Sequence, residues 1–231
     1  MQWNDEGFLL SKNNYGENSI IIEVFTLSHG KCPGIVYGGT SKKIKNYLQL
    51  GNKIHVNLKT KNDSKLGYFK IEIIDAISPF FFDDNRKLNC LFSSLNLLKI
   101  LLPELLNYNS IYVLFSNFLN ELKYSDNWIV HYIFWEINLL REIGFDMNLK
   151  SNSVSKTNSE KNMISVNIDN EKMNIPSFMV EEQFENVDTK SIYYALKLIG
   201  KFFEKNILIP NNLNYPMSRK NLENCFDNER T

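Results

Sequence analysis

The first 80 residues alternate short apolar runs with polar turn clusters, a pattern typical of β-strands. In residues 52–61, Ile54, Val56 and Leu58 alternate with polar side chains, so one face of that strand is apolar. Five short strands in about 80 residues predict a small closed barrel, which has no exposed edge and leaves its loops free to bind. The strands are expected at residues 6–13, 19–27, 32–38, 52–61 and 66–77.

The pattern becomes helical after residues 78–85, because apolar side chains then recur at three- and four-residue spacings. We expect Pro103 to end or kink the first helix. We expect Asp126 to cap the N-terminus of a later helix and Gly144 to end it. The helices are expected at residues 88–102, 110–123, 127–145, 190–206 and 218–226.

The expected fold class is α+β, with a barrel domain in residues 1–80 and an α-helical domain in residues 81–231. Residues 148–175 are rich in Asn, Ser and Lys and form a polar insertion, in which residues 163–175 predict one hairpin. The helix at residues 127–145 is apolar nearly all round. That favours a central, buried position over a groove for a partner.

Neither the cysteines nor the apolar stretches indicate export or a membrane. Cys32, Cys90 and Cys225 are far apart and odd in number, which argues against a disulfide framework and a thiolate zinc site. No apolar stretch reaches the roughly 18 residues of a membrane span without polar interruption. The first ten residues lack the basic and apolar segments of a signal peptide. We therefore expect a cytoplasmic protein.

Positive charge is concentrated in one segment, although the chain as a whole is neutral, with 26 basic and 26 acidic residues. Between Lys31 and Lys70 there are nine lysines and one acidic residue, Asp63. The net charge therefore gives no argument for a polyanionic partner, whereas the charge distribution does.

The chain offers few candidates for catalysis. None of its three histidines, His29, His55 and His131, belongs to a local motif with Asp or Cys, and turn or packing roles fit them better. Walker-type and GxGxxG phosphate loops are absent. Asp83 and Asp84 could hold the metal of a nuclease, but acidic residues also suit a helix N-terminus, which is the favoured interpretation.

Lysines at the turns of the predicted barrel indicate either a nucleic-acid surface or a merely solvated one. Residues 37–45 contain two glycines and three lysines and are expected to form a loop. If the turns meet on one face, their ammonium groups neutralise phosphates and release counterions. Bases could stack on Tyr37, Tyr47 and Tyr68, which lie among the lysines. The candidate cations are Lys31, Lys42, Lys43, Lys45, Lys59, Lys61 and Lys65.

Several motifs in the N-terminal third point to a known family. They are Trp-x-Asp-Glu-Gly from Trp3, Tyr-Gly-Glu-Asn from Tyr15, Thr-x-x-His-Gly-Lys from Thr26 and Gly-Gly-x-Ser-Lys-Lys from Gly38, followed by Leu-Gln-Leu-Gly-Asn at residues 48–52. Together they resemble the start of the RecO family of bacterial recombination mediators. Residues 135–145, 195–206 and 216–226 are similar to the family's central helix and C-terminal end, whereas residues 148–175 match poorly.

The resemblance implies an N-terminal OB-fold that binds single- and double-stranded DNA and anneals complementary strands without catalysis. It also implies two partners, RecR and the single-stranded-DNA-binding protein. The implied outcome is loading of RecA onto DNA coated with that protein, in the RecF pathway and at the nucleoid. Family arginines of the Gly-Gly loop are lysines here, which neutralise phosphate without bidentate geometry.

Some members of the family hold zinc with four cysteines in the insertion. Residues 144–167 of this chain contain no cysteine, so we expect no zinc and no cofactor. A barrel-containing adaptor that binds only protein is the alternative function.

Overall fold

The computed structural model describes residues 2–60, 66–150, 153–156, 162–168 and 171–227. Contacts divide the chain into two compact units, Met1–Val113 (unit 1) and Leu114–Thr231 (unit 2). Among the helices of the described residues, none combines the length and the apolar character that a membrane crossing requires.

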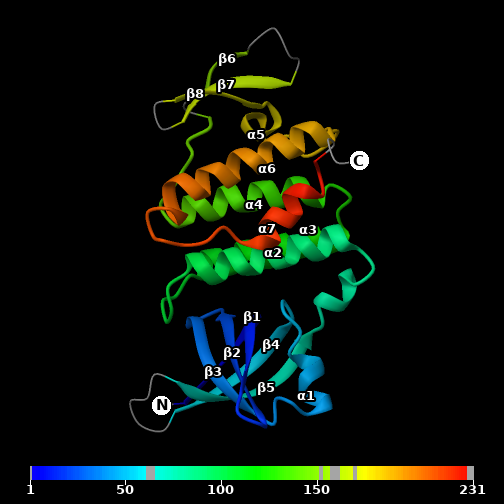
Figure 1. Ribbon diagram of the computed structural model, residues 1–231, viewed down its shortest axis with the longest axis vertical. Helices are drawn as coiled ribbons and strands as arrows, with labels where there is room; N and C mark the ends of the chain where they lie inside the picture. The colour runs from blue at the N-terminus through cyan, green and yellow to red at the C-terminus, as the bar shows by residue number, and fades with distance from the viewer. Residues whose placement is uncertain (1, 61–65, 151–152, 157–161, 169–170, 228–231) are drawn as a thin grey trace. The chain divides into compact units, whose positions relative to one another are not determined.

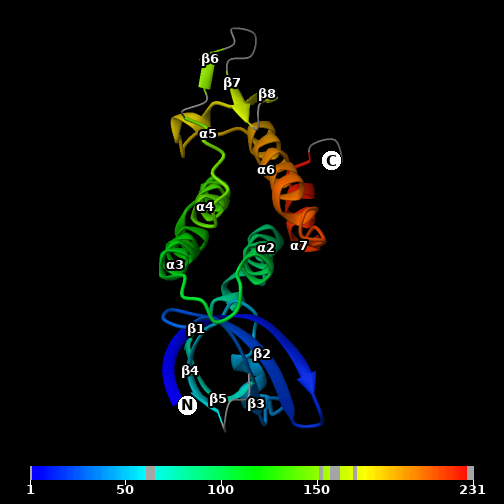
Figure 2. The same cartoon turned by 90° about the vertical axis from the view of Figure 1, so that its left-hand side faces the viewer.

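Unit 1 is built on a closed barrel with the strand order β1-β2-β3-β5-β4, and Figure 2 shows these strands enclosing a ring. Neighbouring strands are antiparallel except β3 and β5, which are parallel. Helix α1 (Lys42–Tyr47) connects β3 to β4, as in an OB-fold, so the predicted barrel is confirmed. The strands are β1 (Gln2–Tyr15), β2 (Ser19–Thr26), β3 (Gly30–Tyr37), β4 (Lys53–Lys59) and β5 (Gly67–Asp75).

The barrel core follows from the period-two pattern of the strands. Ile54, Val56 and Leu58 of β4 are buried, as their alternation predicts, and they pack in one cluster with Ile22 and Val24 of β2. Polar residues between them face outward, which gives the barrel a solvated surface on which charged side chains can gather.

A 3₁₀ turn, η1 (Ser78–Phe81), leads from the barrel into α2 (Asn85–Leu101), which ends before Pro103 as predicted. The Asp84 carboxylate accepts hydrogen bonds from the amides of Arg86 and Lys87, each at 3.0 Å. This N-cap confirms the helix-terminus interpretation of Asp84. Helix α2 belongs to unit 1 although it follows residue 80, and the domain boundary expected there stays a prediction.

Unit 2 contains most of α3, which begins in unit 1, and the helices that follow it (Figure 1). Most of α4 is buried, including Trp128, Tyr132 and Trp135, which confirms the central position predicted for it. Its N-cap is Asn127 and not Asp126, because the first backbone bond of the helix runs from Val130 to the Asn127 carbonyl. The helices are α3 (Asn109–Tyr124), α4 (Trp128–Glu142), α5 (Phe178–Glu181), α6 (Thr189–Phe203), the π-helical turn η2 (Glu204–Leu208) and α7 (Met217–Asn224).

The polar insertion forms an antiparallel sheet with the order β6-β7-β8. The predicted hairpin is confirmed by β7 (Met163–Ile168) and β8 (Glu171–Pro176), which pair from Met163 opposite Pro176 to Ile168 opposite Glu171. Strand β6 (Ser153–Lys156) was not predicted, because a four-residue strand with one apolar residue has no readable period.

Candidate nucleic-acid interface

Residues 42–47 form helix α1 and not the loop that their Gly and Lys content predicts. Ile44, Tyr47 and Leu48 lie on one side of the helix and pack against the barrel core. This packing outweighs the weak helical tendency of so short a segment. Gly38 has a φ of +65° and turns the chain from β3 toward the helix, a conformation that glycine adopts without strain.

The opposite side of α1 is cationic. Lys42, Lys43 and Lys45 are exposed, and none of them forms an ion pair with a residue that the structure describes. Lys12 of β1 places a further cation beside the helix. Its Nζ donates to the carbonyl of Leu48, just past the end of the helix. Burial, and then the charge of Lys45, lowers the pKa of Lys12. The lysines of α1 therefore form a compact group that no carboxylate of the described residues pairs with.

Tyrosines lie at the ends of neighbouring strands of the barrel. Tyr37 of β3 is 64% exposed, and its ring stacks on that of Tyr68 of β5, with the centroids 4.8 Å apart and the planes at 17°. Tyr15 of β1 is 52% exposed and pairs with Ser19 of β2, which pairs in turn with Tyr37. A side-chain hydrogen bond to Tyr68 raises the pKa of Tyr37. Exposed rings in this arrangement can receive the bases of a single strand.

A groove of about 650 Å³ joins Tyr37 to α1. Tyr37 of β3, Lys43 and Tyr47 of α1, and Lys70 of β5 line it, together with apolar side chains of the barrel. Glu72 also lines the groove, but Lys70 Nζ lies 4.0 Å from its carboxylate. Among the described residues, that acid forms an ion pair with a lysine of its own strand and with none of the α1 lysines.

The remaining predicted lysines divide into three cases. Lys59 is exposed on β4 and pairs with Tyr68 of β5, so it lies next to the stacked tyrosines. Lys61 and Lys65 lie outside the described residues. The prediction that Lys31 belongs to the interface is contradicted by the structure.

Lys31 is 8% exposed, and its Nζ donates to the carbonyl of Lys99 at 2.6 Å, in the last turn of α2. Burial lowers its pKa. The sequence placed Lys31 at an open turn, but the segment after α2 covers the start of β3, where the amide of Leu105 donates to the carbonyl of Lys31. Lys31 therefore stabilises a helix C-terminus and does not belong to the interface.

Two sequence motifs, one in β1 and one in the turn between β2 and β3, fold against each other. The buried carboxylate of Asp5 lies 2.7 Å from Nδ1 of His29 and also accepts from the amide of Ser28. The His29 ring stacks on Trp3, with the centroids 3.9 Å apart. His29 thus has a partner that the local sequence did not reveal, and the contacts give it a packing role.

Two family models match the chain: Recombination protein O N terminal over residues 1–77 and Recombination protein O C terminal over residues 83–212. The chain belongs to the RecO family. DNA repair protein RecO of Ehrlichia chaffeensis is 31% identical over 228 residues, which cover 92% of this chain and 93% of that protein. The protein of the same name from Wolbachia pipientis subsp. Culex pipiens is 26% identical over 236 residues, covering 95% and 97%. That of Roseobacter denitrificans is 34% identical over 155 residues, covering 67% and 64%.

RecO membership places the chain in DNA repair and recombination. It does not bring a cysteine zinc site with it, since the residues of the insertion supply no thiolate. In the part of the chain that the structure describes, no group of three or more His, Cys, Asp or Glu side chains is placed to hold a metal.

Sequence reasoning missed Lys12, Tyr15 and Lys70 as members of this candidate interface. Tyr15 immediately precedes a turn cluster, a signal that could have marked it as a loop-facing aromatic residue. Lys12 and Lys70 had no such signal, because only the closing of the barrel brings β1 and β5 beside α1.

Proposed function

We propose that this RecO-family protein binds single- and double-stranded DNA on the barrel of unit 1 and anneals complementary strands, without making or breaking a covalent bond. The observation that carries the proposal is the group of unpaired α1 lysines beside the exposed Tyr37–Tyr68 stack. Lys42, Lys43 and Lys45 would hold phosphates, and Lys59 would extend that contact past Tyr68.

The chemistry of these side chains predicts the character of the binding. Ammonium groups are compact charges that contact phosphates without bidentate geometry, so binding is strongly salt-dependent and tolerant of sequence. Tyrosine rings stack on any base, which favours single strands over duplex at Tyr37. Annealing then follows from effective concentration, because strands held by one protein meet more often than free strands.

The later steps of the proposal rest on family membership. The protein would act with RecR and the single-stranded-DNA-binding protein at the nucleoid, and help to load RecA onto coated DNA in the RecF pathway. These steps need binding and release only, which agrees with a surface built from lysines and tyrosines and with an Asp84 carboxylate that is occupied as a helix cap.

The test is a triple charge reversal, K42E/K43E/K45E, compared with wild type by fluorescence anisotropy on labelled oligo-dT across a salt series. Removing three phosphate contacts should reduce the slope of log affinity against log salt by about 2, at about 0.7 per contact on a single strand. Annealing of strands coated with the single-stranded-DNA-binding protein should fall in parallel.

The matched control is K150E/K172E/K205E, which makes the same charge change on unit 2. Lys150 and Lys205 already pair with Glu182 and Glu171, so their loss should leave the salt slope near that of wild type. Full affinity of K42E/K43E/K45E at low salt would refute the proposed interface. A wild-type protein that does not bind the oligonucleotide even at low salt would favour the protein-only adaptor.

A further inference from the structure

Helix α6 carries a second cationic face, in unit 2. Its 15 residues include Lys190, Lys197 and Lys201 and no acidic residue. All three lysines are exposed, and spacings of seven and four residues place them on one stripe of the helix. The chain as a whole has equal numbers of basic and acidic residues. A helix that carries charge of a single sign therefore departs from the average composition.

Tyrosines accompany these lysines. Nζ of Lys190 lies 5.8 Å from the ring centroid of Tyr194, and Nζ of Lys197 lies 4.6 Å from that of Tyr193. Tyr194 is 45% exposed and follows Lys190 by one helical turn, so it belongs to the same stripe. The stripe therefore repeats the combination of ammonium groups and exposed aromatic rings found at α1.

A recess of about 250 Å³ lies beside the stripe, between α6 and the C-terminal segment. Lys197 and Lys201 of α6 and Lys220 of α7 line it, so three lysines border a space large enough for a phosphate. Glu204 and Glu223 also line it. The lining therefore contains more lysines than carboxylates, three against two.

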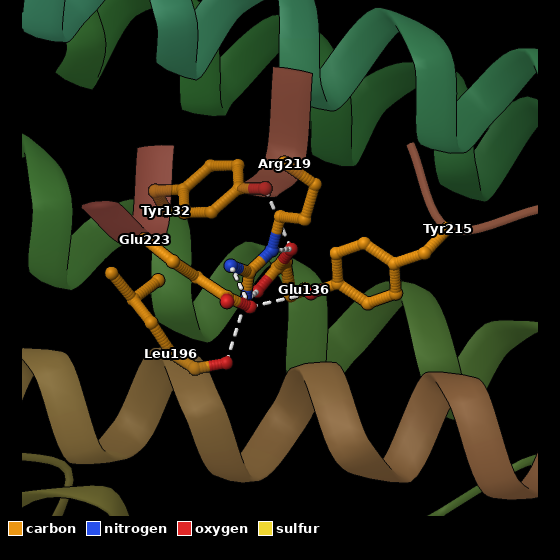
Figure 3. Close-up of polar contacts among 6 residues, drawn as sticks. All are labelled: Tyr132, Glu136, Leu196, Tyr215, Arg219 and Glu223. Atoms are coloured by element: carbon orange, nitrogen blue, oxygen red, sulfur yellow. Dashed lines mark hydrogen bonds and ion pairs between the residues drawn. The ribbon is translucent and has the colours of Figure 1, made fainter. Parts of the chain in front are cut away.

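Glu223 is engaged by hydrogen bonds inside unit 2, as Figure 3 shows, although it shares the single positive charge of Arg219 with Glu136. Its Oε1 accepts from Nη1 of Arg219 at 2.9 Å and from the hydroxyl of Tyr215 at 2.5 Å. Arg219 also donates to the carbonyl of Leu196 at 2.8 Å, which fixes α7 against α6. Glu204 is the one carboxylate of the described lining that this buried network does not engage.

Gly200 lets the wall of the recess approach α6 closely. A Cβ at this position would lie 2.4 Å from the hydroxyl oxygen of Tyr215 and 2.6 Å from Oε1 of Glu223. Only a residue without a side chain permits this contact. Tyr215 therefore packs directly against α6 at Gly200 and forms one wall of the recess.

We propose that the α6 stripe and this recess form a second binding surface for single-stranded nucleic acid, with its phosphates at Lys190, Lys197, Lys201 and Lys220. The proposal rests on the annealing function proposed above and deepens it, because a chain with a site in each unit holds two strands at once. Alternating ammonium groups and exposed rings favour a nucleic acid, which offers phosphates and bases, over an acidic protein surface, which offers charge alone.

The test is the stoichiometry of the full-length chain with an oligo-dT of about 8 nucleotides, within the 4–16 that one OB-fold occupies. Isothermal titration should give two oligonucleotides per chain for the wild type and one for K197E/K201E/K220E. On a longer strand, that variant should also lose about 2 from the salt slope, since three single-strand contacts disappear. The neutral version K197Q/K201Q/K220Q guards against misfolding of the charge-reversed protein and should show the same loss of one site.

The control is again K150E/K172E/K205E, which should keep two sites. Two sites in both α6 variants, with an unchanged salt slope, would overturn the inference while the barrel interface stands. If K42E/K43E/K45E keeps full affinity while the α6 variants lose binding, the barrel assignment fails and the α6 surface is the principal one. One oligonucleotide per wild-type chain, with no effect of the α6 substitutions, would also refute the second site.

Discussion

Arg219 and Glu136, 83 residues apart in sequence, form a bidentate ion pair in the interior of unit 2. Nε lies 2.6 Å from Oε1 and Nη2 lies 2.9 Å from Oε2, and both side chains are at most 1% exposed. Tyr132 donates a further hydrogen bond to Glu136 at 2.6 Å. Burial alone lowers the pKa of Arg219, but the charge of Glu136 outweighs it and raises that pKa well above its ordinary value.

Breaking this pair should be costly. Arg219→Met leaves a buried carboxylate without its partner, and we expect a loss of about 3–5 kcal/mol in the free energy of unfolding. The double variant R219M/E136L removes both charges and should be more stable than R219M, which urea denaturation can measure. A loss of less than about 1 kcal/mol for R219M would show that the network contributes little to stability.

Replacing Lys31 tests whether this lysine contributes to stability through its buried contact or to DNA binding through its charge. Lys31→Met leaves the carbonyl of Lys99 without its donor, so we expect a loss of about 1–3 kcal/mol in stability. Affinity for oligo-dT and its salt slope should equal those of wild type, because the ammonium group never reaches a phosphate. Lys43→Glu should show the reverse, with lower affinity and unchanged stability. A smaller salt slope for Lys31→Met would contradict the correction made above.

Tyr37 should contribute by stacking and not by charge. Tyr37→Ala is expected to weaken binding of single-stranded DNA by about 1–3 kcal/mol, the range for loss of one base–aromatic contact. The salt slope should not change, since no ammonium group is removed. Tyr37→Phe keeps the ring and should bind nearly as wild type does. If the Phe variant were as weak as the Ala variant, the hydroxyl and not the ring would be the contact.

Asp188 makes the stability of α6 depend on pH. Its carboxylate accepts from the amide of Ser191 at 2.9 Å and from the Ser191 hydroxyl at 2.7 Å. Burial opposes ionisation, but these hydrogen bonds lower the pKa of Asp188 below its ordinary 3.8. A lowered pKa in the folded state means that the contribution is complete above the ordinary pKa. It is lost as the pH falls through the folded-state value.

Asp188→Ala should therefore cost about 1 kcal/mol at neutral pH, the usual value of an N-cap. The difference from wild type should shrink as the pH drops below the ordinary pKa of an aspartate. Asp188→Asn keeps a capping oxygen that does not titrate, and it should retain most of the stability at both pH values. Urea midpoints of the three proteins at neutral and acidic pH give the comparison. A constant difference between wild type and Asp188→Ala would exclude the linkage.

The elements that the sequence predicted have their cause within a few residues. The strand at Ile54, Val56 and Leu58 and the hairpin from Met163 to Pro176 follow from local periods and turn residues. Helix α1 was missed although its apolar residues have helical spacing, because glycines and lysines around them suggested a loop. Its folding depends on a barrel core assembled from distant strands.

The candidate interface divides in the same way. Lys42, Lys43 and Lys45 could be chosen from composition, since consecutive charged residues with no acid nearby remain exposed in most folds. The exposure of Lys31 could not be predicted, because it depends on Lys99 and Leu105, about 70 residues later. The network around Arg219 was equally hidden, since its members come from α4, α6 and α7.

The sequence by itself determined the barrel, the order of the main helices and the family, because periodicity and short motifs are properties of neighbouring residues. Only the tertiary structure decided which charges are available. Folding buried Lys31 and paired Arg219 with Glu136, while it left the lysines of α1 and α6 exposed to solvent. The physical reason is that the energy of a charge depends on its solvent and its neighbours, and the folded chain sets both.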